Sequence, residues 1–187
     1  MAVIAVGGYG RGEMAPYSDI DIMILMPKNT SVAHTKFIEF MLYILWDLGL
    51  KIGHSTRNVS ESIAAARDNQ TVLTSLLEMR YVAGDESLWT KLACAVQHEI
   101  GNQKPLVFVE EKLSERDIRH KRFGDTRYVV EPNVKDGKGG LRDLHSLFWI
   151  TKYAYRANSI VDIVEQGVLR DGEARKFALA QRFLWTV

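Results

Sequence analysis

Two aspartates, Asp19 and Asp21, stand at the start of a strand pattern, shortly after a glycine-rich stretch. Residues i and i+2 of a strand point to the same face, with their Cα atoms roughly 6–7 Å apart. Two carboxylates placed in this way repel each other unless a cation lies between them. Mg²⁺, or Mn²⁺ in its place, accepts carboxylate oxygens and keeps other positions for water and phosphate. Such an ion can activate a hydroxyl and stabilise a leaving pyrophosphate, so Asp19 and Asp21 are the candidate catalytic and metal-binding residues.

The glycine-rich stretch, Gly7-Gly8-Tyr9-Gly10-Arg11-Gly12, admits several interpretations. A dinucleotide fingerprint fails because Glu13 occupies the place of its third glycine, and the Gly-Lys-Ser/Thr of a P-loop is absent. A kinase loop lacks its later partner motifs. What remains is a turn whose backbone amides can approach phosphate oxygens closely, with an arginine able to clamp them. We therefore predict nucleotide contacts from Gly7, Gly8 and Arg11.

A small mixed sheet has to position these residues. The patterns predict strands over 2–6, 20–26 and 50–54, and a helix over 31–48. Its expected apolar face consists of Phe37, Phe40, Met41, Ile44, Leu45 and Leu48. Helices are predicted for 61–67, 70–82, 86–100, 109–123, 141–156, 159–168 and 172–186. The expected architecture is an α/β (α+β) domain followed by an all-helical domain, with a boundary between residues 80 and 105 that we place after residue 85.

A second cluster lies in and after the predicted loop 124–140, which contains four glycines and Pro132. Loops of this length inside a compact domain are usually functional. Lys135, Lys138 and Arg142 stand beside Gly139-Gly140, where a starting helix would direct its amides at an anion. We predict that Lys135 and Arg142 bind nucleotide, with contact to a protein partner or a solvated loop as the open alternatives.

Composition limits the other function classes. The chain has 187 residues, a net charge of +1 and a charged content of 25%, which argues against bulk binding of nucleic acid or an anionic membrane. Its single cysteine permits no internal disulfide, as expected of a cytoplasmic protein. The sequence enters a strand at once and stops within a predicted helix, so we expect part of a longer chain that need not be active alone.

Several of these motifs together resemble a known family. Gly7-Gly8 followed by Ser18-Asp19-Ile20-Asp21 is similar to the signature of DNA polymerase β-like nucleotidyltransferases. More narrowly, the chain resembles the bacterial PII uridylyltransferase/uridylyl-removing enzymes. The segments that carry this resemblance are the glycine stretch with the aspartates, Leu45-Trp46-Asp47, Gly53-His54-Ser55-Thr56-Arg57, Glu131-Pro132-Asn133-Val134-Lys135 and Gly139-Gly140-Leu141-Arg142-Asp143-Leu144-His145.

The resemblance implies a reaction: transfer of UMP from UTP to a tyrosine of the PII nitrogen-signalling protein, with Mg²⁺ and release of pyrophosphate. It implies that residues 1–85 form the nucleotidyltransferase domain and 86–187 the helical domain, and it adds Ser18 to the nucleotide-binding residues. The family's uridylyl-removing hydrolase domain and glutamine-sensing domains would lie outside this sequence. UTP and PII are the expected partners, with no nucleic acid and no membrane.

One departure from the superfamily pattern concerns a third carboxylate, which usually comes from a later strand and assists deprotonation of the attacking hydroxyl. The candidate strand, residues 50–55, contains no acid. Glu61, Glu78 or Glu131 are possible substitutes, and His54 is either a replacement base or a structural residue. Two other hypotheses therefore stay open: a nucleotidyltransferase that acts on a small molecule, and a binding module without turnover.

Overall fold

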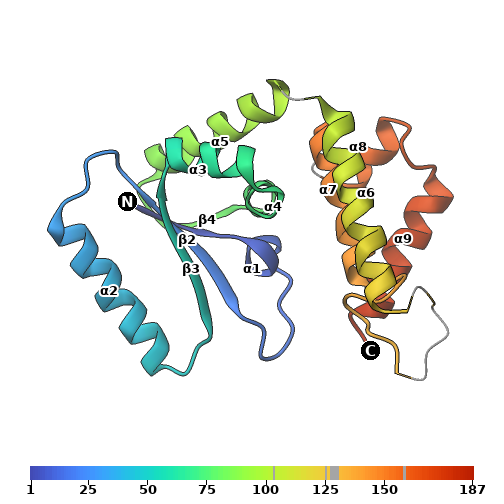
Figure 1. Cartoon of the computed structure of the whole chain (residues 1–187), viewed down its shortest axis with the longest axis horizontal. Coiled ribbons are helices and arrows are strands. Elements are labelled where there is room, and N and C mark those ends of the chain that lie inside the picture. The colour runs from blue at the N-terminus through green and yellow to red at the C-terminus, as the bar shows by residue number, and fades with distance from the viewer. Residues whose placement is uncertain (103, 125, 127–130, 158) are drawn as a thin grey trace. The chain divides into compact units, whose positions relative to one another are not determined.

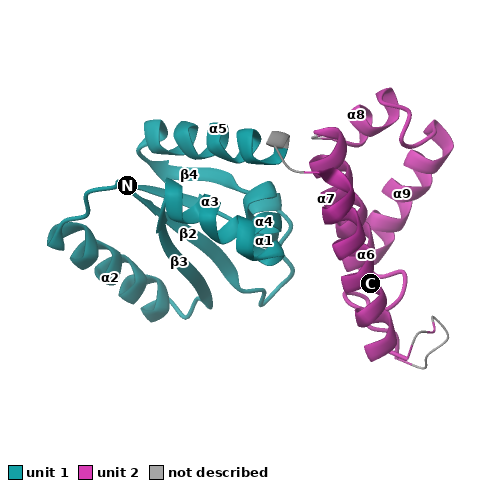
Figure 2. Ribbon diagram, turned by 45° about the horizontal axis from the view of Figure 1, so that its top comes forward, with its two compact units in different colours: residues 1–102 teal, residues 103–187 magenta. Residues whose placement is uncertain are grey.

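The computed structural model describes residues 1–102, 104–124, 126, 131–157 and 159–187. The chain forms two compact units, residues 1–102 and 103–187 (Figure 2). This division lies after helix α5 (Glu86–Asn102), whereas we placed the domain boundary after residue 85. The difference arises because α5 packs on helix α3 and on strands β1, β2 and β4, all of unit 1.

Unit 1 contains a four-stranded mixed sheet in the order β3-β2-β1-β4. Its strands are β1 (Ala2–Ala5), β2 (Ile20–Met26), β3 (Ile52–Asn58) and β4 (Arg80–Gly84). Strand β1 is antiparallel to both β2 and β4, while β2 and β3 run parallel. The buried apolar residues of β1 and β2 make these two strands the sheet interior. The predicted fold class, a small mixed sheet followed by helices, is confirmed.

The prediction of a single helix over residues 70–82 is wrong, because the last of these residues belong to strand β4. Helix α4 (Gln70–Leu77) is capped by Asn69, whose side chain accepts hydrogen bonds from the Thr71 and Val72 amides, and it ends before Glu78. The next residues pair with β1. Aromatic and β-branched residues such as Tyr81 and Val82 suit a strand, but only the free edge of β1 selects that conformation here.

Helices cover both faces of the sheet (Figure 1). Helix α2 (Val32–Asp47) packs against Ile22, Ile24 and Met26 on one face. On the other face lie α3 (Val59–Asp68) and α5, where the Ser62 hydroxyl of α3 contacts the Met23 sulfur at 3.8 Å. The short helix α1 (Gly7–Arg11) connects β1 to the loop that leads into β2. The start of β2 is thereby fixed between α1 and β3.

The apolar face of α2 differs from the predicted one. Its buried residues are Ile38 and Leu42, with Met41 and Leu45 partly buried against the sheet. The other members of the predicted face, Phe37, Phe40, Ile44 and Leu48, are all exposed. Apolar residues surround this helix on nearly every side, so spacing alone did not identify the side that meets the sheet.

Unit 2 is helical in its described residues, with α6 (Pro105–Arg122), α7 (Leu141–Tyr155), α8 (Ile160–Glu165) and α9 (Asp171–Leu184). Helices α6 and α7 pack together around the stacked rings of Phe108 and Tyr153, whose centroids are 4.1 Å apart. Of the predicted loop 124–140, residues 125 and 127–130 lie outside the described residues. No helix among the described residues is long and apolar enough to cross a membrane.

Candidate functional site

Asp21 is anchored by backbone contacts on both sides of β2. The Val6 amide donates a hydrogen bond to the Asp21 carbonyl oxygen at 3.0 Å, so the glycine-rich turn starts beside this residue. On the other side, the Ile20 amide donates to the Lys51 carbonyl oxygen at 2.8 Å, and Asp21 is in register with Gly53. Asp19 lies just before the strand and is exposed, while Asp21 is half-buried. The structure thus brings the predicted acidic pair to one end of β2.

The carboxylate of Asp21 lies between two glycines. A Cβ atom on Gly7 would be 3.1 Å from Asp21 Oδ2, and a Cβ atom on Gly53 would be 2.4 Å from Asp21 Oδ1. Gly7 also has a φ of +57°, a conformation that residues with a side chain rarely adopt. The two glycines therefore provide the space that the carboxylate occupies. We did not predict this role for Gly53, although a glycine within a strand often marks a close approach.

The glycine-rich stretch forms the single helical turn α1 rather than an open loop, and it ends at Gly12 in the left-handed conformation, with a φ of +74°. Gly10 is buried where a Cβ atom would be 2.2 Å from the Glu78 carbonyl oxygen. The absence of a side chain at Gly10 lets the turn pack directly on the end of α4. Gly7 and Gly8, two of the predicted nucleotide contacts, lie in the first half of this turn.

Arg11, the predicted phosphate clamp, contacts two carboxylates. Its Nε donates to Glu13 at 2.9 Å, and its Nη1 donates to Glu78 at 2.6 Å. Only 16% of the Arg11 side chain and 3% of the Glu78 side chain are exposed. These ion pairs fasten α1 to the end of α4, and they neutralise the charge that a phosphate clamp would need. A role of Arg11 in phosphate binding stays a prediction.

The substitutes for a third carboxylate have other contacts. Glu78 pairs with Arg11, and Glu61 forms a capping box with Asn58 at the start of α3. Glu131 belongs to unit 2. His54 is in register with Ile22, so it lies on the α2 face of the sheet, with its ring centroid 6.1 Å from that of Trp46. Since alternate strand residues point to opposite faces, His54 is directed away from the face of Asp21.

The donor atoms at the start of β2 suit a hard divalent cation, because carboxylate oxygens are the ligands that Mg²⁺ and Mn²⁺ prefer. Within the described residues, no group of three or more His, Cys, Asp or Glu side chains is arranged to hold a metal. Asp19 and Asp21 alone would leave most coordination positions to water and substrate phosphate, as is usual for Mg²⁺. Ser18 is exposed beside Asp19, and its amide donates to the Ala15 carbonyl oxygen at 3.1 Å.

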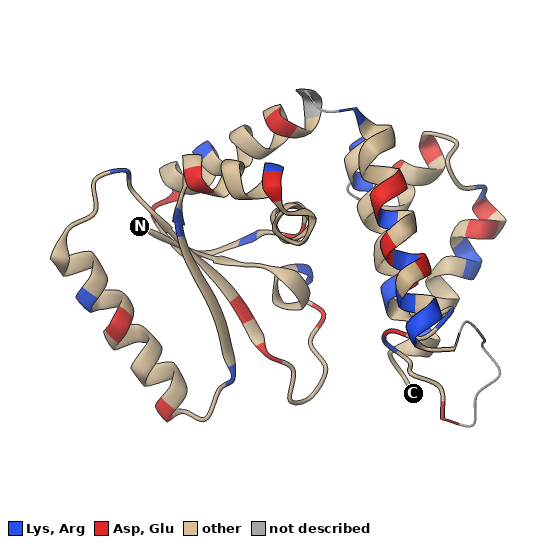
Figure 3. Cartoon of the chain, in the orientation of Figure 1, with Lys and Arg blue, Asp and Glu red and all other residues tan. Residues whose placement is uncertain are grey.

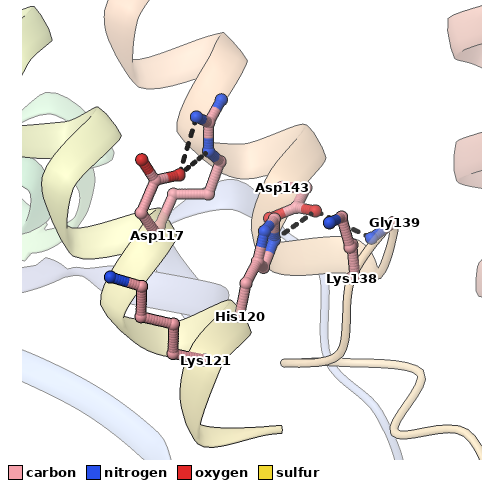
Figure 4. Close-up of a pocket in the computed structure, with 7 residues that line it drawn as sticks. Asp117, His120, Lys121, Lys138, Gly139 and Asp143 are labelled. Atoms are coloured by element: carbon pink, nitrogen blue, oxygen red, sulfur yellow. Dashed lines mark hydrogen bonds and ion pairs between the residues drawn. The ribbon is translucent and has the colours of Figure 1, made fainter. Parts of the chain in front are cut away.

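Unit 2 contains a separate polar cavity of about 680 Å³. Basic positions gather at the end of α6, which forms one wall (Figure 3). The lining residues come from α6, from the loop before α7 and from the first turn of α7 (Figure 4): Arg116, Asp117, His120, Lys121, Lys138, Gly139 and Asp143. The predicted residues Lys135 and Arg142 are not among them. Arg142 lies 5.8 Å from the ring centroid of Trp149, and Lys135 is exposed.

Asp143 is the hub of this cavity. Its carboxylate accepts hydrogen bonds from Arg119 Nη2, from His120 Nε2 at 2.9 Å and from the Gly139 amide at 2.8 Å. Burial raises the pKa of Asp143, but the hydrogen bonds from Gly139, His120 and Arg119 together outweigh it, so the pKa lies below its usual value. The Asp143 carboxylate therefore links α6 to α7 and to the loop that precedes α7.

Replacing Asp143 by Asn should lower the stability of the chain at pH 7 by about 1–3 kcal/mol, because Arg119 would lose its counter-ion. Since the folded-state pKa is depressed, the wild-type stabilisation exists above the unfolded pKa of about 3.9 and disappears as the pH falls through the folded value. Urea denaturation of both proteins at pH 7 and near pH 3 measures this, and the difference should shrink in acid.

Asp117→Asn is a matched control, since Asp117 also lines the cavity and pairs with an arginine of α6. Its side chain is 57% exposed, so the loss should stay below about 1 kcal/mol. Equal losses in the two variants, or a difference independent of pH, would contradict the role given to Asp143.

Two family models match different parts of the chain, and one relative matches all of it. Residues 1–70 match the family model of the nucleotidyltransferase domain, and residues 107–187 match that of the GlnD PII-uridylyltransferase. Over all 187 residues, the chain is 51% identical to a bifunctional uridylyltransferase/uridylyl-removing enzyme of Rhodospirillum rubrum. The aligned segment makes up 20% of that relative, so the chain spans about a fifth of its length.

Proposed function

Because the chain belongs to the family of bifunctional uridylyltransferase/uridylyl-removing enzymes, we propose that it carries the site that transfers UMP from UTP to a tyrosine of the PII signalling protein. The observation that supports this best is the Asp21 carboxylate, held between Gly7 and Gly53 at the start of β2. It lies in the segment that matches the nucleotidyltransferase domain. The relative from Rhodospirillum rubrum is a uridylyltransferase, which supports the proposal that the transferred group is uridylyl.

In the proposed reaction, the tyrosine oxygen bonds to the α-phosphorus of UTP while the bond from that phosphorus to the bridging oxygen breaks. Pyrophosphate leaves with the electron pair, and the hydroxyl proton passes to a base. Asp19 and Asp21 would hold Mg²⁺, which when bound neutralises charge on the triphosphate. Gly7 and Gly8 leave room for the phosphates to approach the backbone, and Ser18 is a further proposed contact.

The nucleotide-binding roles of Lys135 and Arg142 stay part of the proposal. Both belong to the segment that matches the GlnD PII-uridylyltransferase model. Asp136 Oδ1 lies 3.6 Å from Arg142 Nε, which is too long for a hydrogen bond, so this ion pair is weak. UTP and PII as partners are likewise proposed from the family resemblance, and a cytoplasmic location is proposed from the single cysteine.

The full-length protein, incubated with UTP, Mg²⁺ and PII, should add one uridylyl group to a PII tyrosine, detected by mass spectrometry of the intact PII protein. Pyrophosphate release measured in the same reaction should match the amount of modified PII. A PII variant with that tyrosine replaced by phenylalanine is the control, and it should remain unmodified. Absence of modification with natural PII, under conditions where UTP binds, would contradict the proposed reaction.

A binding module without turnover is the second candidate, and one observation favours it: among the described residues, no group of three or more His, Cys, Asp or Glu side chains is arranged to hold a metal. In that case UTP would bind in a Mg²⁺-dependent manner without release of pyrophosphate. Modification of a small hydroxyl compound in place of PII would instead indicate a nucleotidyltransferase of the small-molecule type. The same assay, with either acceptor, distinguishes the three functions.

A further inference from the structure

Strand β3 places a row of residues beside the acidic end of β2. In the parallel register, Asp21 pairs with Gly53, Met23 with Ser55 and Leu25 with Arg57. Residues at these alternate positions share one face of the sheet, so Gly53, Ser55 and Arg57 lie on the face of Asp21. Strand β3 is also an edge strand of the sheet, and all three residues are partly exposed. Helices α3 and α5 lie over Met23 and Leu25 on this face, so a ligand would reach the row from the open edge at β3.

The side chain of Arg57 folds back along the row toward Asp21. Its Nη1 donates a hydrogen bond to Ser55 Oγ at 3.2 Å, so the end of the side chain lies beside Ser55. The Asp21 carboxylate, in turn, leans over Gly53, close to where a Cβ atom would be. The guanidinium therefore lies on the same face as the carboxylate, beside Ser55, the next alternate position of β3 after Gly53.

Arg57 and Arg11 differ in the groups that surround their positive charges. Arg11 is paired with Glu13 and Glu78. The contact described for Arg57 is with the neutral hydroxyl of Ser55, and no ion pair of Arg57 occurs among the described residues. One hydrogen bond uses one of the five N–H donors of a guanidinium, so the others are available to an anion.

A phosphate that binds the same cation as Asp21 would lie on the face of the sheet that carries Ser55 and Arg57. A guanidinium donates to phosphate oxygens over about 2.8 Å, often through two N–H groups at once. Arg57 is therefore placed to contact such a phosphate directly.

We infer that Arg57, rather than Arg11, supplies the positive charge that binds the polyphosphate part of the nucleotide. This assignment rests on the proposed function and identifies a residue of the same site. Arg11 then has a structural role, in which it fastens the glycine turn to the end of α4.

Binding of Mg²⁺-UTP and of Mg²⁺-pyrophosphate to the full-length protein tests this by isothermal titration calorimetry. Arg57→Gln should weaken both ligands by roughly 10–100-fold, because a charge-assisted contact is lost. Arg57→Lys should recover part of the affinity. Lys36→Gln is the matched control, since it removes the same charge from the exposed surface of α2, on the other face of the sheet, and should leave both affinities unchanged.

Thermal unfolding of the unliganded variants separates binding from folding. Arg57→Gln should keep the wild-type midpoint. If Arg57→Gln lowers the midpoint of thermal unfolding, Ser55→Ala tests the role of Arg57 instead, because this variant keeps the arginine charge but removes the hydrogen bond that positions the guanidinium. We expect Ser55→Ala to lower the affinity for pyrophosphate several-fold. Wild-type affinity in the folded Arg57→Gln or Ser55→Ala variant would overturn the inference while leaving the proposed function intact. No binding of either ligand by the wild-type protein would instead reject the proposed function itself.

Discussion

Asp21→Asn should reduce uridylyl transfer by the full-length protein at least about a thousandfold, equivalent to about 4 kcal/mol of transition-state stabilisation. Asn keeps the shape of the side chain but removes the negative charge that would hold a divalent cation beside the triphosphate. The fold should persist, because Asp21 is anchored through backbone hydrogen bonds to Val6 and to the neighbouring strand. Initial rates of PII modification at saturating UTP and Mg²⁺ measure the loss, and circular dichroism checks the fold.

Asp47→Asn is the matched control for this experiment. Asp47 is exposed at the last residue of α2, far along the chain from the glycine turn, and its replacement should leave the rate within about twofold of wild type. A near wild-type rate for Asp21→Asn would remove Asp21 from the catalytic machinery. An equal loss in Asp47→Asn would show that the assay responds to surface charge rather than to the site.

Gly53→Ala tests the space around the Asp21 carboxylate. The new Cβ atom would be 2.4 Å from Asp21 Oδ1, so the carboxylate must move. A side-chain end can swing away at little cost, and we expect stability to fall by less than about 1 kcal/mol. Displacing a reacting group by about 1 Å can nevertheless cost a hundredfold in rate, so transfer should fall roughly 10–100-fold.

The Gly53→Ala variant is measured by thermal unfolding and by PII modification in parallel. Gly172→Ala in α9 is its control, because a Cβ atom there would meet nothing within 4 Å and should leave rate and stability near wild type. Full activity in Gly53→Ala would mean that the position of the Asp21 carboxylate is not critical. Loss of activity together with global unfolding would show that Gly53 serves the fold rather than the site.

Local sequence determined the elements that bear the acids. Alternating apolar residues from Ile20 to Met26 predicted the strand that carries Asp21, and the glycines before it predicted a turn beside the strand's start. Both features are present. They could be predicted because strand alternation and glycine conformation depend on neighbouring residues in the chain. The same local logic identified the helices of unit 2.

Local sequence did not reveal which distant segments meet. Residues 80–84 became a strand because β1 had an edge to pair with, and α2 buried Ile38 and Leu42 rather than the predicted Phe37 and Phe40. Both outcomes depend on the surface that an element meets, and neither propensity nor spacing contains that information. The correct secondary structure could therefore be inferred only where local preference and tertiary contact agreed.

The candidate site shows the same division. The sequence by itself determined that two carboxylates follow a glycine turn and share one face of a strand. Only the tertiary structure decided that Glu78, 67 positions from Arg11, neutralises that arginine, and that Gly53 makes room for Asp21. It also decided that Arg57 bonds to Ser55 on the face of the sheet that carries Asp21. The physical reason is that charge pairing and close packing depend on distances in space, which chain folding sets between residues far apart in sequence.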